Sequence, residues 1–148
     1  MPIVGAILVP HPPIIIPTVG RGRETEVQDT IDAYRAAAGQ AAAWSPEVLI
    51  VTSPHTVMYA DYFHISPGKG ALGDMSAFGA PQTNLEVVYD AKLREERVRQ
   101  AEAVGVQAGT LGEKDPSLDH GTFLPLYFLQ EAGVNCPILR IGLSGFSP

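Results

Sequence analysis

The sequence has little cysteine, few charged residues and no long uninterrupted apolar run. Cys136 is the single cysteine among the 148 residues, so no disulfide can form within the chain, and a reducing cytoplasm is the expected location. No positively charged region precedes the N-terminal apolar residues, which argues against a secretory signal peptide. The apolar stretch 3–19 is broken by prolines and is short for a membrane span, so we expect no membrane association.

The chain has few charged residues, and its basic residues are not clustered. Asp, Glu, Lys and Arg together form 18% of the chain, and the net charge is −6. Lys and Arg gather in no cluster, so we expect no nucleic-acid partner. By contrast, 45% of the residues are hydrophobic, which is enough to fill a core, and no repeat or linker divides the sequence. Residues 1–148 are therefore predicted to form a single domain.

Apolar runs and helix-like segments alternate along the chain. The runs at 3–9, 48–52 and 137–143 are largely continuous rather than alternating, which is typical of parallel strands buried on both faces. A helix-like segment at 24–44 separates the first two runs, so we expect a right-handed βαβ unit. The other expected elements are strands at 59–66 and 84–89, loops at 67–81 and 105–117, and helices at 91–104 and 122–132. The predicted fold class is α/β, with a mostly parallel sheet flanked by helices in three layers, incomplete at its C-terminus.

Two histidines follow the first two predicted strands. His11 stands in a PHPP motif after the run 3–9, and His55 ends an SPH motif after the run 48–52. Neighbouring parallel strands lie about 4.8 Å apart, so imidazoles at their carboxyl ends can share a metal with bonds of about 2.0–2.2 Å. Either histidine alone could equally be a loop residue bonded to the backbone, but the matched pair favours a metal site.

A third histidine, His120, stands in an LDHG motif just before the predicted helix 122–132. The helix dipole disfavours the imidazolium and Asp119 favours it, so a neutral histidine that accepts and returns a proton is one hypothesis. The alternative is that Asp119 or Thr122 caps the helix and His120 has no chemical role. The remaining histidine, His64, lies within a strand pattern and is interpreted as structural.

Together these motifs resemble the class III extradiol dioxygenase family in its B-type form, and in particular its Memo-like branch, which occurs in AmmeMemoRadiSam proteins. The resemblance rests on the order and spacing of four motifs: VPHPP at 9–13, TSPH at 52–55, DYFHI at 61–65 and SLDHGTFLPL at 117–126. It covers nearly the whole chain. It implies that residues 1–148 correspond to the N-terminal half of such a domain.

The resemblance also implies roles for the motif residues. His11 and His55 would bind a non-haem Fe(II), with zinc or another divalent metal as the alternative. His120 matches the family's acid–base or substrate-contacting histidine, and His120 and Asp119 are the predicted catalytic residues. The family's third metal ligand is usually a carboxylate in the C-terminal half, which has no counterpart here. Asp119 is the alternative source of a carboxylate.

Two functions follow as hypotheses. The first is an Fe(II)-dependent dioxygenase-type domain that acts with O₂ on a catechol-like aromatic diol, in extradiol ring cleavage. The second is a Memo-like metal-binding or redox-regulatory module without ring-cleavage activity. Aromatic side chains near the metal would favour the enzyme, and Tyr59, Tyr62 and Phe123 are the candidates. We also expect the chain to form a homo-oligomer or to associate with a missing C-terminal half, because its last strand is otherwise uncovered.

Overall fold

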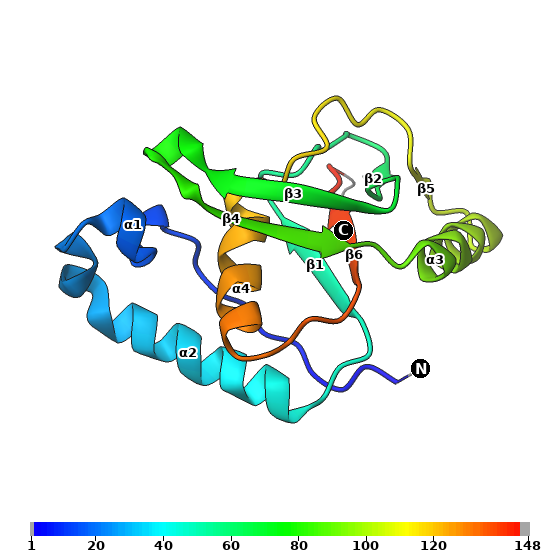
Figure 1. The fold of residues 1–148 in the computed structure, drawn as a ribbon. Helices are drawn as coiled ribbons and strands as arrows, with labels where there is room; N and C mark the ends of the chain where they lie inside the picture. The colour runs from blue at the N-terminus through cyan, green and yellow to red at the C-terminus, as the bar shows by residue number, and fades with distance from the viewer. Residues whose placement is uncertain (1, 146–148) are drawn as a thin grey trace.

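The computed structural model describes residues 2–145 as a mixed α/β fold. Figure 1 shows α2 and α4 packed together on one side of the central strands and α3 on the other side. This arrangement agrees with the predicted three-layer α/β class. In chain order the elements are η1 (Pro13–Ile15), α1 (Pro17–Gly20), η2 (Arg23–Val27), α2 (Gln28–Ala43), β1 (Leu49–Ser53), β2 (Phe63–His64), β3 (Gly70–Met75), η3 (Ser76–Phe78), β4 (Ala80–Val88), α3 (Ala91–Ala103), β5 (Ala108–Gly109), α4 (His120–Glu131) and β6 (Ile138–Gly142).

Two of the three strand pairs in the described residues are parallel. β1 pairs with β6, from Leu49 opposite Ile138 to Ser53 opposite Gly142, and the short β2 pairs with β5. The third pair, β3 and β4, is an antiparallel hairpin. Because β1 and β6 run parallel, their carboxyl ends meet at one edge, and the turn after β1 starts from that edge.

The N-terminal apolar run is not a strand, contrary to the prediction. Residues 2–12 form no regular element, and the side chains of Ile3 and Leu8 are 87% and 99% exposed. The run has the composition of a buried strand, but a strand also needs a ladder partner and a covering layer. In the described residues β1 forms its ladder with β6 instead. The predicted βαβ unit is therefore not formed, and α2 leads into β1 without a paired strand before it.

The predicted helices are present with shifted starts. α2 begins at Gln28 rather than at Glu24, because the preceding residues form the 3-10 turn η2. α3 spans almost its whole predicted range. α4 begins at His120 rather than at Thr122, because Asp119 caps it. None of the helices in the described residues has the length and apolar character needed to cross a membrane.

The segment 67–81 was expected to be a loop, but it contains β3 and the turn η3. Its glycines allow close packing. A Cβ at Gly73 would lie 2.7 Å from the Leu118 Cβ, and one at Gly70 would lie 2.2 Å from the Val87 carbonyl oxygen. β4 begins at Ala80, shortly after η3 and earlier than the predicted start at residue 84.

Strand length and burial also depart from the prediction in three places. The predicted strand 59–66 shortens to β2, and the predicted loop 105–117 contains its two-residue partner β5. β1 is covered on one face only, so that Ile50 on the other face is 54% exposed. β6 is mostly buried, as predicted.

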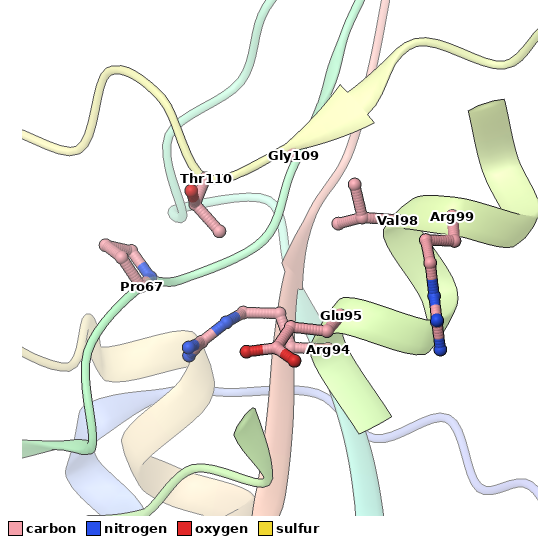
Figure 2. Close-up of a pocket in the computed structure, with 7 residues that line it drawn as sticks. All are labelled: Pro67, Arg94, Glu95, Val98, Arg99, Gly109 and Thr110. Carbon is pink, nitrogen blue, oxygen red and sulfur yellow. The ribbon is translucent and has the colours of Figure 1, made fainter. Parts of the chain in front are cut away.

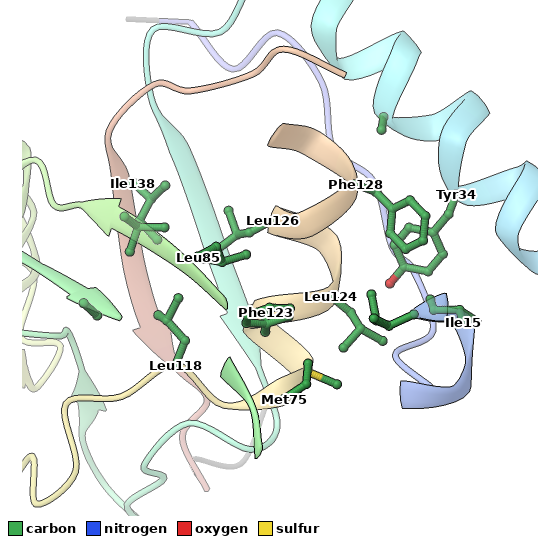
Figure 3. Close-up of a cluster of buried hydrophobic side chains, with 14 of the residues drawn as sticks. Ile15, Tyr34, Met75, Leu85, Leu118, Phe123, Leu124, Leu126, Phe128 and Ile138 are labelled. Carbon is green, nitrogen blue, oxygen red and sulfur yellow. The ribbon is translucent and has the colours of Figure 1, made fainter. Parts of the chain in front are cut away.

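The hydrophobic core lies around α4. Figure 3 shows the α4 side chains Phe123, Leu124, Leu126 and Phe128 within this cluster, and each is at most 2% exposed. Phe128 packs against Tyr34 of α2, with ring centroids 4.6 Å apart. Burying an apolar side chain of this size contributes about 1.5–3 kcal/mol. The core therefore fixes the position of α4, whose first residue, His120, and N-cap, Asp119, are two of the predicted site residues.

Candidate metal centre

Three of the four histidines come together in space. His11 precedes η1, His55 lies in the turn after β1, and His120 is the first residue of α4. One ring nitrogen from each lies within 4.8 Å of the others. The Nε2 atoms of His11 and His55 are 2.9 Å apart, and the ring centroids of His55 and His120 are 4.1 Å apart. The structure thus groups the two predicted metal ligands with the predicted acid–base histidine.

The separation of the His11 and His55 nitrogens fits two ligands of one divalent metal ion. Two nitrogens bonded at about 2.1 Å, with a right angle between the bonds, lie roughly 3.0 Å apart. The observed Nε2–Nε2 separation of His11 and His55 is 2.9 Å. His11 and His120 are half-buried and His55 is exposed, so ions can reach the group from solvent. Among the described residues, no carboxylate belongs to the group.

The surroundings of His120 favour its neutral form. Burial lowers the pKa of this imidazole, and positive charge on His55 or His11 lowers it further. Asp119 acts in the opposite direction but is outweighed. The N-terminus of α4 adds to the lowering, since the helix dipole disfavours a cation there. A neutral imidazole can bind a metal or accept a proton.

Asp119 is bonded to the protein around it and does not join the three histidines. Its Oδ1 accepts hydrogen bonds from the Thr122 N–H at 3.0 Å and the Ser53 hydroxyl at 2.6 Å. Its Oδ2 accepts from the Thr122 hydroxyl at 2.8 Å, Arg140 Nη2 at 2.9 Å and the Thr56 hydroxyl at 3.2 Å. Burial alone would raise the pKa of Asp119, but these hydrogen bonds outweigh it and lower the pKa to about 2. In this geometry the carboxylate is charged, and its contacts are those of a helix cap.

A second polar cluster adjoins this cap. Glu113 Oε1 accepts from the Ser66 hydroxyl at 2.7 Å and lies 3.3 Å from His64 Nε2. Arg140, which bonds to Asp119, has its Nη1 atom 4.0 Å from the same oxygen. His64 is fully buried and lies outside the group of three histidines, in keeping with its interpretation as structural.

Helix α2 contacts the segment that carries His11. The Tyr34 hydroxyl donates to the carbonyl of Pro10, the residue before His11. Tyr34 is buried, and burial raises its pKa, so the phenol stays protonated and remains a donor. Local sequence patterns gave no signal for this contact, because it joins two segments through a single hydroxyl.

The match to known proteins extends over nearly the whole chain. Residues 5–147 match the family model of the catalytic LigB subunit of aromatic ring-opening dioxygenase. The chain belongs to the LigB family. This confirms the resemblance to class III extradiol dioxygenases that the motifs suggested.

This LigB-family chain is also similar to Protein CA_C1420 of Clostridium acetobutylicum. The two are 29% identical over 159 residues, which cover 97% of this chain and 32% of the relative. The chain therefore spans about a third of the length of that curated relative.

In the part of this LigB-family domain that the structure describes, the aromatic side chain of Phe78 lies beside His120. The Phe78 ring centroid is 5.3 Å from that of His120, with the ring planes at 70°. Phe78 belongs to η3, and Arg21 Nη2 donates to the Gly79 carbonyl at 2.9 Å, which holds this turn. Phe78 was not among the aromatic candidates from the sequence, because its segment reads as a loop and no local pattern marks it.

The aromatic candidates chosen from the sequence have other surroundings. Tyr59 and Tyr62 pack against each other, with ring centroids 5.6 Å apart. Phe123 is fully buried in the core around α4. Of the aromatic residues considered, Phe78 is therefore the one placed to meet a molecule bound at the histidines.

Two surface hollows in the described part of the LigB-family domain contain none of the three histidines. Figure 2 shows one of about 510 Å³ beside α3 and β5, lined by Pro67, Arg94, Glu95, Val98, Arg99, Gly109 and Thr110. Its arginines are engaged: Arg94 donates to the Gly68 carbonyl at 2.8 Å, and Arg99 pairs with Glu96. Converging donor atoms identify chemistry better than hollow volume does, so the histidines remain the candidate site.

Proposed function

We propose that the chain is the metal-binding part of an extradiol-type dioxygenase. In this proposal His11 and His55 hold Fe(II). His120 accepts a proton from a catechol-like aromatic diol, which reacts with O₂, and later returns it. The observation that carries the proposal is the convergence of three imidazole nitrogens within 4.8 Å in a chain of the LigB family.

The position of each residue suggests its role in the proposed reaction. Fe(II), when held by His11 and His55, supplies Lewis-acid and redox chemistry toward the diol oxygens and O₂. His120, kept neutral by burial and by its histidine neighbours, would accept a diol proton at a ring nitrogen and return it later. Phe78 offers an apolar ring beside His120, which suits an aromatic substrate.

The donor set also supports a second function. Three imidazoles without a carboxylate form the ligand set of some zinc centres, whereas a facial Fe(II) site uses two histidines and a carboxylate. No carboxylate of the described residues joins the group. The competing proposal is therefore a Memo-like metal-binding or redox-regulatory module that keeps its metal and cleaves no ring.

Metal binding is tested first. The protein is loaded anaerobically with Fe(II) and desalted, and its metal content is compared with that of His11→Ala, His55→Ala and His120→Ala. We expect the first two variants to lose the ion and His120→Ala to keep it. Cys136→Ala, which removes the single thiol, is the control and should bind as the wild type does. Full iron content in both His11→Ala and His55→Ala would contradict the proposed site.

Diol binding separates the two functions. The iron-loaded, desalted protein is titrated anaerobically with 4-nitrocatechol, whose absorption shifts when its hydroxyls lose protons. We expect a shift proportional to bound iron, and a smaller shift in His120→Ala. If turnover occurs, oxygen uptake by His120→Ala should fall by about 10²–10⁴-fold. An iron-loaded protein that gives no shift would support the metal-binding module and overturn the dioxygenase.

A further inference from the structure

We infer that Ser53 and Asp119 form a positioning pair that fixes His55 relative to His120, and that the pair thereby sets the geometry of the metal site. This inference rests on the proposed metal site. It assigns to Asp119 a role that acts through the two histidines, without contact with the metal or the substrate.

The two histidines come from separate parts of the fold, so their spacing has to be set by contacts between these parts. His55 lies two residues past the end of β1, and His120 opens α4. Their ring centroids are only 4.1 Å apart. A shift of the turn against the helix start would therefore displace His55, a proposed metal ligand, from its place beside His120.

Ser53 makes the first link across this junction. Its buried hydroxyl oxygen accepts a hydrogen bond from the His55 backbone N–H at 3.1 Å. The same hydroxyl donates to Asp119 Oδ1 at 2.6 Å. One side chain thus connects the backbone of His55 to the residue directly before His120.

Asp119 makes the second link through its other oxygen. Oδ2 accepts from the Thr56 hydroxyl at 3.2 Å, so residues on both sides of His55 bond to the same carboxylate. Because Oδ1 also accepts from the Thr122 N–H at 3.0 Å, that carboxylate holds the turn and caps the helix that begins with His120.

Arg140 supports the pair from β6, the strand paired with β1. It lies on β6 opposite Val51 of β1, and its Nη2 donates to Asp119 Oδ2 at 2.9 Å. The side chain of Arg140 is 4% exposed. A buried carboxylate needs such a partner, so the contact with Arg140 helps to hold Asp119 where both elements can bond to it.

The test measures metal affinity and coordination rather than turnover. Co(II) is the probe, because its visible absorption reports coordination geometry, and affinity is measured by competition with a chelator. The variants are Ser53→Ala, which leaves the helix cap in place, and Asp119→Asn, which removes the charge at nearly constant shape. Asp90→Asn is the matched control, since Asp90 caps α3 by accepting from the Leu93 N–H at 2.8 Å. Thermal unfolding of the metal-free variants shows which of them fold.

We expect Ser53→Ala and Asp119→Asn to bind Co(II) about 10–100-fold more weakly than the wild type, with an altered absorption spectrum. Asp90→Asn should keep the affinity and the spectrum of the wild type. A folded Ser53→Ala with unchanged affinity and spectrum would overturn the inference alone. An equal loss in Asp90→Asn would also overturn it, by assigning the loss to general destabilisation. A wild type that binds no Co(II) would overturn the proposed metal site itself.

Discussion

At the scale of single residues, the absence of a side chain at Gly121 leaves room for the turn that carries His55 to pack against α4. A Cβ there would lie 2.4 Å from the Ser53 hydroxyl oxygen and 3.1 Å from His55 Cδ2. Gly→Ala inside a helix ordinarily stabilises it by about 1 kcal/mol. At Gly121 we expect the opposite sign, a loss of about 1–3 kcal/mol, together with weaker metal binding, because the turn has to move.

Gly39 in α2 is the matched control for this substitution. A Cβ at Gly39 would meet nothing within 4 Å, so Gly39→Ala should raise the free energy of unfolding. Urea unfolding and Co(II) titration of the two alanine variants measure both effects. A Gly121→Ala protein as stable and as metal-competent as Gly39→Ala would show that the turn tolerates the methyl group.

The low pKa of Asp119 predicts acid-sensitive stability. Its pKa is about 2 in the folded chain, compared with 3.8 for an unperturbed aspartate. A carboxyl whose pKa falls on folding stabilises the fold above its unfolded pKa, and this contribution is lost as the pH drops through the folded value. The difference corresponds to about 2 kcal/mol. Between about pH 5 and pH 2, the metal-free wild type should lose about that much more unfolding free energy than Asp119→Asn. Parallel curves would contradict the prediction.

The site residues that the sequence identified stand next to recognisable local patterns, whereas the residues that it missed do not. His11, His55 and His120 each stand next to a strong local pattern, two after apolar runs and one at a helix start. Phe78 and Arg140 carry no such mark. Phe78 reaches His120 because a hairpin folds back, and Arg140 reaches Asp119 from a distant strand. Contacts of this kind depend on tertiary packing and produce no periodic pattern in the sequence.

At the scale of elements, α2 holds the His11 segment through Tyr34. Tyr34→Phe removes the hydroxyl that donates to the Pro10 carbonyl and leaves the ring packed on Phe128. We expect a stability loss of about 1 kcal/mol, the usual contribution of one hydrogen bond. We also expect several-fold weaker Co(II) binding, because His11 loses a support. Tyr127→Phe, on α4, is the control and should leave metal affinity unchanged. Equal affinity in Tyr34→Phe and the wild type would show that this bond does not position His11.

Helices were easier to predict than strands for a physical reason. α2, α3 and α4 make their backbone hydrogen bonds within one segment, so local composition and caps such as Asp90 indicate them well. The run 3–9 has strand composition but no ladder partner in the described residues, and the segment 67–81 pairs despite its glycines. Strand pairing is set by distant residues, so composition alone misplaced both.

At the scale of the whole molecule, the N-terminal segment presents an apolar surface. Its exposed large side chains are Ile3, Val4, Ile7 and Leu8. We expect the protein to self-associate as concentration rises, because contiguous exposed apolar side chains favour contact between copies. Size-exclusion chromatography with light scattering measures this.

The double variant Ile3→Glu, Leu8→Glu should shift the protein toward the monomer. It should change the stability of the monomer by only about 0.5 kcal/mol, since both side chains are exposed. Val104→Glu, at an exposed apolar position beyond α3, is the control and should associate as the wild type does. A wild type that stays monomeric at high concentration would show that this surface does not drive association.

The pairing of β1 with β6 also decides when during synthesis the site can form. Leu49 and His55 leave the ribosome before the ladder partner of β1 and the guanidinium that pairs with Asp119, both of which belong to Ile138–Gly142. Pairings between segments so distant in sequence form slowly. A nascent chain therefore carries His11 and His55 before β6 and Arg140 are available to support their site. In the proposed metal site, stable metal binding would therefore follow the docking of β6 on β1.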